Sequence, residues 1–180
     1  RSLIWQKAYR LLHKIIPNSK VGIAQNVTSF DAFHKHSILE MIAVGLSALV
    51  TNHIFYFLTK GYHDFLGLNY YFHYRFNLKK GLIPEIANPE KNKMDISDLG
   101  WEIYPEGLFN ALTDLSDGLP IYITEAGIAS TNDDRRTRFL INFLQETFRA
   151  IEVGIKVKGF FYWSLLDVFE WERGFNARFG

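Results

Sequence analysis

The 180-residue sequence contains no cysteine, which excludes disulfide bonds, thiolate metal sites and a cysteine nucleophile. It also lacks an excess of charge of either sign, because 20 lysines and arginines stand against 19 aspartates and glutamates, for a formal charge of +1. Such a balance gives no electrostatic reason to expect a nucleic acid or an anionic membrane as a partner, and we expect neither.

Long apolar runs are missing as well. The longest, residues 41–50, is shorter than the roughly 20 residues needed to cross a bilayer, and we expect it to form part of a buried core helix. No basic-then-apolar signal peptide opens the sequence. We expect a cytoplasmic protein and a chain truncated at both ends, with its natural N-terminus absent.

Aromatic residues, by contrast, are abundant. They make up 16% of the chain, enough to fill a core or to line a site for flat, partly apolar ligands such as sugars. The length suits one domain or part of a larger one, so we expect residues 1–180 to belong to a single domain.

Hydrophobic periodicity predicts an alternation of helices and strands. The expected helices cover residues 3–16, 33–58, 105–115 and 133–153; the expected strands cover residues 21–24, 64–76, 121–124 and 158–166; residues 77–100 are expected to form a loop. Strands separated by helices pair in parallel and form a sheet covered by helices. A small open α/β sheet and half of a (β/α)8 barrel, which needs about 250 residues when complete, both fit this order.

Polar and aromatic residues gather at three expected strand ends, in residues 65–71, 121–127 and 160–171. Ligand sites in parallel α/β folds form beyond the carboxyl ends of the strands. A carboxylate that directly follows an apolar strand, such as Glu125, therefore lies where chemistry is expected.

Each of these residues also has an inert interpretation. Glu125 could cap a helix or lie solvated in a loop, and Glu170 could simply pair with one of the arginines that follow it. For Tyr71 and Trp163 the alternative is core packing.

Five segments taken together resemble one family, glycoside hydrolase family 1, the β-glucosidase and β-glycosidase family. Residues 123–127 resemble its nucleophile motif Thr-Glu-Asn-Gly, and residues 163–171 resemble its signature Trp-Ser-Leu-Leu-Asp-Asn-Phe-Glu-Trp. Residues 174–180 continue that signature, residues 64–71 resemble Asp-Phe-Ile-Gly-Leu-Asn-Tyr-Tyr, and residues 100–108 match a further segment. The first 60 residues match mainly in the order of their elements.

The resemblance implies a (β/α)8 TIM barrel, of which this chain would be the C-terminal half with about strands 5 to 8. It implies a retaining β-glycosidase that hydrolyses terminal β-glucosides or related glycosides without a metal or cofactor. Glu125 would be the nucleophile and Tyr71 its hydrogen-bond donor. The substrate-binding residues would be Asn69, Trp163, Glu170, Trp171 and Phe179.

The expected chemistry accounts for these residue types. Retaining hydrolysis uses two carboxyl groups about 5–5.5 Å apart, one as nucleophile and one as acid and then base. A tyrosine O–H donated to a carboxylate stabilises its charged form, and indole faces match the apolar face of a pyranose.

The sequence departs from the family pattern in three ways. Ala126 and Val168 each stand where the family has asparagine, and the Asn-Glu-Pro motif that carries the acid/base glutamate does not occur. If β-strand 7 ends at Glu125, that motif would lie upstream of Arg1. The missing acid would then come from an N-terminal half-barrel, which we expect as a partner.

Two other functions remain open at this point. The chain could be a carbohydrate-binding module, or an interaction module made from a half-barrel that no longer catalyses. A nucleophile with its own hydrogen-bond donor argues against binding alone, since recognition of a sugar does not need one.

Overall fold

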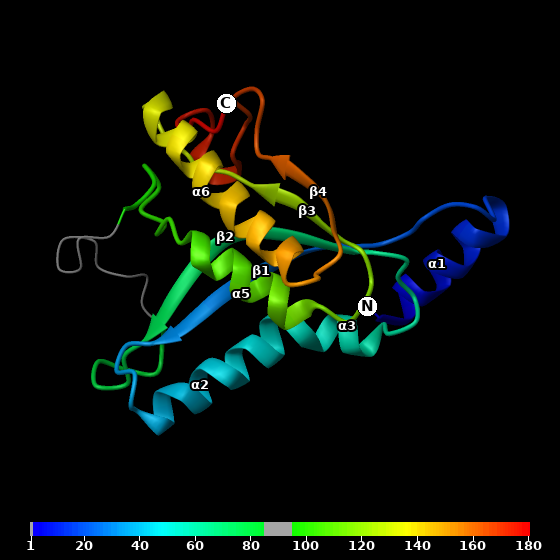
Figure 1. Cartoon of the computed structure of the whole chain (residues 1–180), viewed down its shortest axis with the longest axis horizontal. Helices are drawn as coiled ribbons and strands as arrows, with labels where there is room; N and C mark the ends of the chain where they lie inside the picture. Colours follow the sequence, from blue (N-terminus) through cyan, green and yellow to red (C-terminus); the bar gives the residue numbers. More distant parts are fainter. Residues whose placement is uncertain (1, 85–94) are drawn as a thin grey trace.

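The computed structural model of the chain describes residues 2–84 and 95–180 (Figure 1). Its elements in chain order are α1 (Ser2–Ile15), β1 (Ala24–Ala32), α2 (Ile38–Ala48), the π-helical turn η1 (Leu49–His53), α3 (Ile54–Leu58), β2 (Leu66–Phe76), α5 (Pro105–Leu115), β3 (Ile121–Ala126), α6 (Asp133–Glu152), β4 (Val157–Tyr162) and the 3-10 turn η2 (Trp171–Arg173). Part of the expected loop over residues 77–100, namely residues 85–94, lies outside the described residues.

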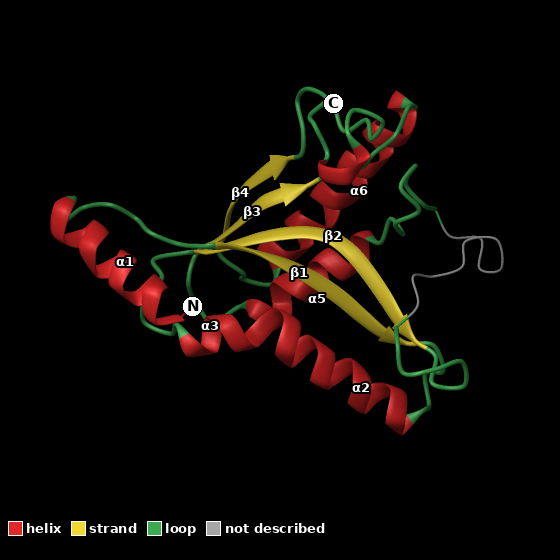
Figure 2. Ribbon diagram, turned by 180° about the vertical axis from the view of Figure 1, so that it is seen from behind, coloured by secondary structure: helices red, strands yellow, loops and turns green. Residues whose placement is uncertain are grey.

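The four described strands form one parallel sheet in the order β1-β2-β3-β4, as the alternation of elements predicts. Helices α5 and α6 lie side by side against one face of this sheet (Figure 2). Sequential parallel strands connected by helices on the outside are the arrangement of a (β/α)8 barrel, and four strands make half of one.

The core lies between the sheet and these two helices. Ile121 and Ile123 of β3 are fully buried there, together with Leu112 of α5 and Phe143 of α6. Successive side chains of a strand point to opposite faces, so the residues that alternate with these isoleucines, such as Thr124, lie on the other face and are only partly buried. The face away from α5 and α6 is therefore free to form a site.

The first strand was predicted in the wrong place. β1 begins at Ala24, where the expected strand over residues 21–24 ends. It continues to Ala32, because β2 extends to Phe76 and pairs with β1 along its whole length. The many polar residues of β1 conceal this strand in the sequence. Its register shifts between Val27 and Thr28, and there the Asn52 side chain accepts a hydrogen bond from the Thr28 N–H (3.1 Å) and donates one to its carbonyl (2.9 Å).

The second helix differs from expectation at its start and in its burial. It begins at Ile38 and not at residue 33, since the Ser37 hydroxyl caps it by accepting a hydrogen bond from the Glu40 N–H. The prediction of a buried core helix over residues 41–50 is wrong, because Glu40 is the only buried residue among those described for α2. The helical stretch Ile38–Leu58 has the length and composition of a membrane-crossing helix, and very little of its most apolar part is buried.

The last strand is shorter than predicted. It ends at Tyr162 and not at residue 166, and Trp163 follows it directly. The segment beyond folds back over the strand ends, with the Ser164 N–H donating to the Phe179 carbonyl (3.3 Å) and the Gly180 N–H to Asp167 (3.0 Å). This fold-back brings the C-terminal residues to the site.

Candidate active site

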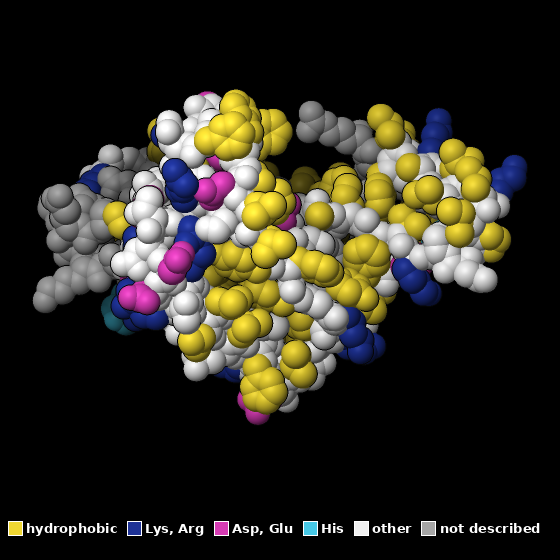
Figure 3. Space-filling view, turned by 90° about the horizontal axis from the view of Figure 1, so that it is seen from above, with side chains coloured by type: hydrophobic (Ala, Val, Ile, Leu, Met, Phe, Trp, Pro, Cys, Tyr) yellow, Lys and Arg dark blue, Asp and Glu magenta, His cyan; other side chains and the backbone are white. Residues whose placement is uncertain are grey.

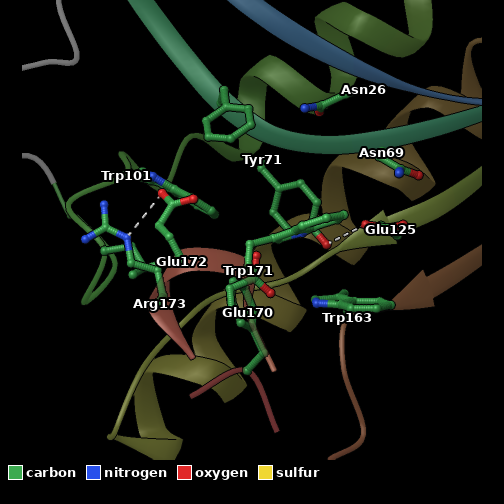
Figure 4. Close-up of a pocket in the computed structure, with 13 residues that line it drawn as sticks. Asn26, Asn69, Tyr71, Trp101, Glu125, Trp163, Glu170, Trp171, Glu172 and Arg173 are labelled. Atoms are coloured by element: carbon green, nitrogen blue, oxygen red, sulfur yellow. Dashed lines mark hydrogen bonds and ion pairs between the residues drawn. The ribbon is translucent and has the colours of Figure 1, made fainter. Parts of the chain in front are cut away.

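A pocket of about 610 Å³ lies at the carboxyl ends of the strands (Figure 4). Residues from β1, β2, β3 and the segments after β2 and β4 line it: Asn26, Asn69, Tyr71, Phe72, Leu99, Trp101, Glu125, Trp163, Glu170, Trp171, Glu172, Arg173 and Phe179. All seven site residues predicted from the sequence are among them. Segments far apart in the chain thus meet in one cavity.

Glu125 and Tyr71 form the central contact of this pocket. The Tyr71 hydroxyl donates a hydrogen bond to Oε2 of Glu125 over 2.9 Å, from β2 to β3. Burial raises the pKa of Tyr71 far above its usual range, and the negative charge of Glu125 raises it further. The phenol therefore stays protonated and remains a donor to the carboxylate.

Glu125 does not serve as a helix cap. The cap of α6 is Asn132, whose side chain accepts a hydrogen bond from the Asp134 N–H over 2.9 Å. The register of β2 and β3 shifts after Leu68, so that Asn69 pairs with Glu125. This irregularity places both side chains at the pocket.

Asn69 has a fixed orientation beside the carboxylate. Its Oδ1 accepts a hydrogen bond from the Thr124 hydroxyl over 2.6 Å. The acceptor end of the amide is thereby engaged, and the amide N–H2 is the end left to donate to a ligand.

Trp163 is held at the end of β4 by close packing of the backbone. Its N–H donates to the Ala126 carbonyl (3.0 Å), and the peptide bond to Ser164 is cis. A Cβ on Gly127 would lie 1.7 Å from the Trp163 carbonyl oxygen, so only glycine fits there. The indole lies next to Glu125 in the pocket (Figure 4).

The aromatic wall beside Tyr71 includes Phe179, which is 1% exposed. Its ring centroid lies 6.3 Å from that of Tyr71 and 6.3 Å from that of Trp101. The C-terminal segment therefore contributes one wall of the pocket through Phe179.

Glu170 lies in the pocket without the arginine pairing that the inert interpretation required. Arg173 pairs with the neighbouring Glu172 (3.8 Å), and Arg178 pairs with Asp167 (3.2 Å). Trp171 also lines the pocket, although it is 81% exposed. This side of the cavity is open to solvent in the half-barrel.

Six of the thirteen pocket residues received no role from the sequence, among them Trp101 and Asn26. Trp101 belongs to the resembling segment 100–108 and packs against Phe72 with ring centroids 4.7 Å apart. Asn26 lies on the polar part of β1, which the apolar pattern did not predict as strand. The position of Trp101 within a recognised segment was the one available signal.

The described residues contain no group of three or more histidines, aspartates or glutamates that could hold a metal ion. The carboxylates of the pocket are those of Glu125, Glu170 and Glu172. The arrangement can bind a polyhydroxylated ring between indole faces and carboxylates and can present one oriented carboxylate to it.

Comparison with known proteins identifies the family. The family model of Glycosyl hydrolase family 1 matches residues 32–180. The chain belongs to this family. Among curated relatives, the β-galactosidase of Pyrococcus woesei is 34% identical over 136 residues, which cover 66% of this chain and 27% of that protein. The β-glucosidase A of Acetivibrio thermocellus is 38% identical over 133 residues, which cover 65% of this chain and 29% of that protein.

Solved structures extend the family likeness to nearly the whole chain. The family 1 glycoside hydrolase of Thermotoga maritima, solved with a cyclophellitol analogue as a transition-state mimic, superposes with a TM-score of 0.82 and 25% identity. The match covers 97% of this chain and 48% of that structure. The chain thus has the fold of a family 1 half-barrel and spans less than half the length of these relatives.

Proposed function

We propose that this chain supplies the nucleophile and most of the sugar-binding surface of a retaining β-glycosidase. The observation that carries the proposal is the Tyr71–Glu125 hydrogen bond of 2.9 Å inside a pocket lined by Trp163 and Glu170. The substrates would be terminal β-glucosides or related β-glycosides. Family membership and the two named relatives support this substrate class.

The reaction would proceed in two steps. A Glu125 carboxylate oxygen attacks the anomeric carbon, the glycosidic C–O bond breaks, and the leaving oxygen takes a proton from an acid. Water then attacks the same carbon, gives a proton to that acid's conjugate base, and releases Glu125 as a carboxylate.

Sugar recognition would fall to the residues around Glu125. The Trp163 indole would stack on the pyranose, and Glu170 would accept hydrogen bonds from its hydroxyl groups, with the Trp171 N–H as a donor. Asn69 would donate from its amide, and Phe179 would pack behind the same subsite. Each of these side chains borders the pocket.

The acid/base carboxyl group would come from an N-terminal half-barrel carrying strands 1 to 4. The described half leaves β1 and β4 each paired with one neighbour only, so each presents an open edge. Two further strands bonded at these edges would begin to close the barrel around the pocket that contains Glu125.

The same half would cover apolar surface that this chain exposes. Leu3, Ile4 and Ile15 of α1 are each at least 65% exposed. Figure 3 shows hydrophobic side chains over the lobe at the right, where Figure 1 places α1. For the exposed apolar face of α2 we also favour this occupant over a bilayer, because Glu40 ties the start of α2 to the segments that follow β1 and β2. Its carboxylate accepts hydrogen bonds from the His34 and Leu78 N–H groups (2.7 and 3.1 Å).

Covalent labelling tests the proposal in the complete barrel, meaning this chain joined to or co-expressed with an N-terminal family 1 half. A 2-deoxy-2-fluoro β-glucoside with a good leaving group should form a stable ester on Glu125, located by peptide mass spectrometry. Glu125→Gln should fold but should form no ester and show no turnover. Glu152→Gln, on the exposed end of α6, should be labelled and turn over substrate as the wild type does.

Other outcomes would assign another function. Sugar binding without a label or turnover would indicate a binding module, and neither binding nor turnover would indicate an interaction module. Labelling of a different residue would contradict the role of Glu125.

A further inference from the structure

A buried ionic cluster lies beside the pocket and does not enter the reaction above. His73 of β2 is at its centre, with a side chain that is 0% exposed. Its Nδ1 lies 2.9 Å from Glu102 Oε2, and its Nε2 lies 2.9 Å from Asp31 Oδ2. The Tyr104 ring stacks on the imidazole with centroids 3.9 Å apart. One side chain thereby joins β1, β2 and the segment that leads into α5.

The geometry favours the doubly protonated form of this histidine. Both ring nitrogens lie 2.9 Å from carboxylate oxygens, and ionised carboxylates only accept hydrogen bonds, so a proton on each nitrogen satisfies both contacts. Arg75 adds a second cation, donating to both oxygens of Glu102. Glu102, only 7% exposed, is therefore held by two positively charged donors.

Glu102 directly follows Trp101, the unassigned aromatic residue of the pocket. Residues 96–102 form a tight turn: the Trp101 N–H donates to Ser97 Oγ (3.1 Å), and the Ser97 N–H donates to the Trp101 carbonyl (2.8 Å). Ile96 and Glu102 form the antiparallel bridge at its base.

The other side of this turn is fixed from α6. Arg135 donates to Asp95 (3.0 Å) and to Asp98 (3.1 Å). Arg135 and the His73 cluster therefore hold the turn from its two sides, with Trp101 between them. Of the two, His73 acts on the residue adjacent to the indole.

We propose that His73 is a positioning residue which, through Glu102, holds Trp101 against the pocket and so sets how well the site accepts aromatic leaving groups. The wall that Trp101 forms with Phe72 and Leu99 is apolar, which suits an aryl aglycone. A small leaving group such as methanol has no ring to stack on this wall. The inference rests on the proposed glycosidase function for its kinetic consequence only.

The position of Trp101 can be measured without catalysis. The complete barrel would be labelled with 5-fluorotryptophan, and the ¹⁹F resonance of Trp101 would be assigned as the one lost in Trp101→Phe. In His73→Gln this resonance should shift or broaden, while that of Trp163 stays in place. The control is His53→Gln, which removes another histidine–carboxylate pair (His53 to Asp114, 2.6 Å) away from this pocket.

Kinetics would supply the second readout. For an aryl β-glucoside, His73→Gln should raise KM about five- to tenfold with kcat changed less than about twofold, as expected for a displaced stacking surface. KM for methyl β-glucoside should stay within about twofold of wild type. His53→Gln should leave the ratio between the two substrates unchanged.

A second variant keeps the test decisive if His73→Gln does not fold. Glu102→Gln retains the shape of the side chain and removes its charge, and it should produce the same change at Trp101. The positioning role is wrong if a folded variant leaves both the Trp101 resonance and the ratio of KM values for the aryl and methyl glucosides unchanged. Absence of turnover in the wild-type complete barrel would contradict only the proposed function, because the ¹⁹F measurement would still decide the role of His73.

Discussion

The Tyr71 hydroxyl and the Glu125 carboxylate, 54 residues apart in the chain, meet across the β2–β3 boundary at 2.9 Å. The contact depends on where the strands end and on the register shift after Leu68. A tyrosine held in this way can only donate, because burial and the adjacent carboxylate raise its pKa far above its usual range. Its function should therefore be to orient and stabilise the charged nucleophile.

The first prediction removes this hydrogen bond. In the complete barrel, Tyr71→Phe should lower kcat/KM for an aryl β-glucoside about 10- to 100-fold, since a hydrogen bond to a charged group contributes about 1.5–3 kcal/mol. Tyr122→Phe is the matched control, because that ring packs on Phe65 (centroids 5.1 Å apart) and does not line the pocket. Equal losses in both variants would indicate a packing effect and contradict the assigned role.

The second prediction concerns Glu170. Hydroxyl contacts in glycosidase sites strengthen in the transition state, so Glu170→Ala should lower kcat more than it weakens binding of an unreactive sugar analogue. Trp163→Ala should lower kcat and also weaken binding of the analogue, because it removes a stacking face. Steady-state kinetics and calorimetric titration separate the two quantities. A Glu170→Ala protein with altered thermal stability and normal kinetics would show that this carboxylate is structural.

The strand order was predictable because it follows from alternation. An apolar strand such as residues 121–124, placed between amphipathic helices, usually pairs in parallel with the neighbouring strands. The limits of β1 were not predictable, because its exposed edge and its contact with Asn52 allow polar residues where a core strand would be apolar. Tertiary partners determined that strand more than its own pattern did.

The sequence named part of the pocket lining but not the contacts that hold it in place. The resemblance named seven residues, and all of them line one pocket. Trp101 had no assigned role because nothing in the sequence shows that residues 96–102 form a turn tied to β2 by His73 and Glu102. Likewise, the burial of α2 was overestimated because its apolar side chains face outward from this half-barrel.

The third prediction is a pH dependence of stability centred on His73. Burial by itself would lower the pKa of His73, but hydrogen bonds to Asp31 and Glu102 outweigh it and raise the pKa, against the opposing charge of Arg75. The stability that the charged His73 imidazolium adds to the folded state should be fully present below the pKa of the unfolded chain, about 6.5. It should disappear as pH rises through the higher pKa of the folded state. Tyr104, stacked on the ring, stays neutral in this range because burial raises its pKa to about 12.

The matched measurement is chemical unfolding of the complete barrel between about pH 5 and 9. The stability difference between wild type and His73→Gln should be largest near the acid end and should shrink above about pH 6.5. The pKa values of Asp31 and Glu102 are lowered, the first mainly by the hydrogen bond to His73, so their contribution fades only in more acidic solution. A difference that does not vary with pH would contradict a charged His73.

The last prediction concerns the chain by itself. Expressed alone, residues 1–180 should self-associate, because the open edges of β1 and β4 and the exposed apolar side chains of α1 and α2 have no partner. The chain should also lack appreciable β-glucosidase activity, since loss of general acid catalysis typically costs about 10²–10⁴-fold in rate. Co-expression with an N-terminal half should restore a monodisperse species and turnover together, because the two halves would share one barrel. Size-exclusion chromatography with an aryl β-glucoside assay measures both quantities. A soluble, monomeric and fully active 180-residue chain would show that the second carboxylate lies within it and that the half-barrel needs no complement.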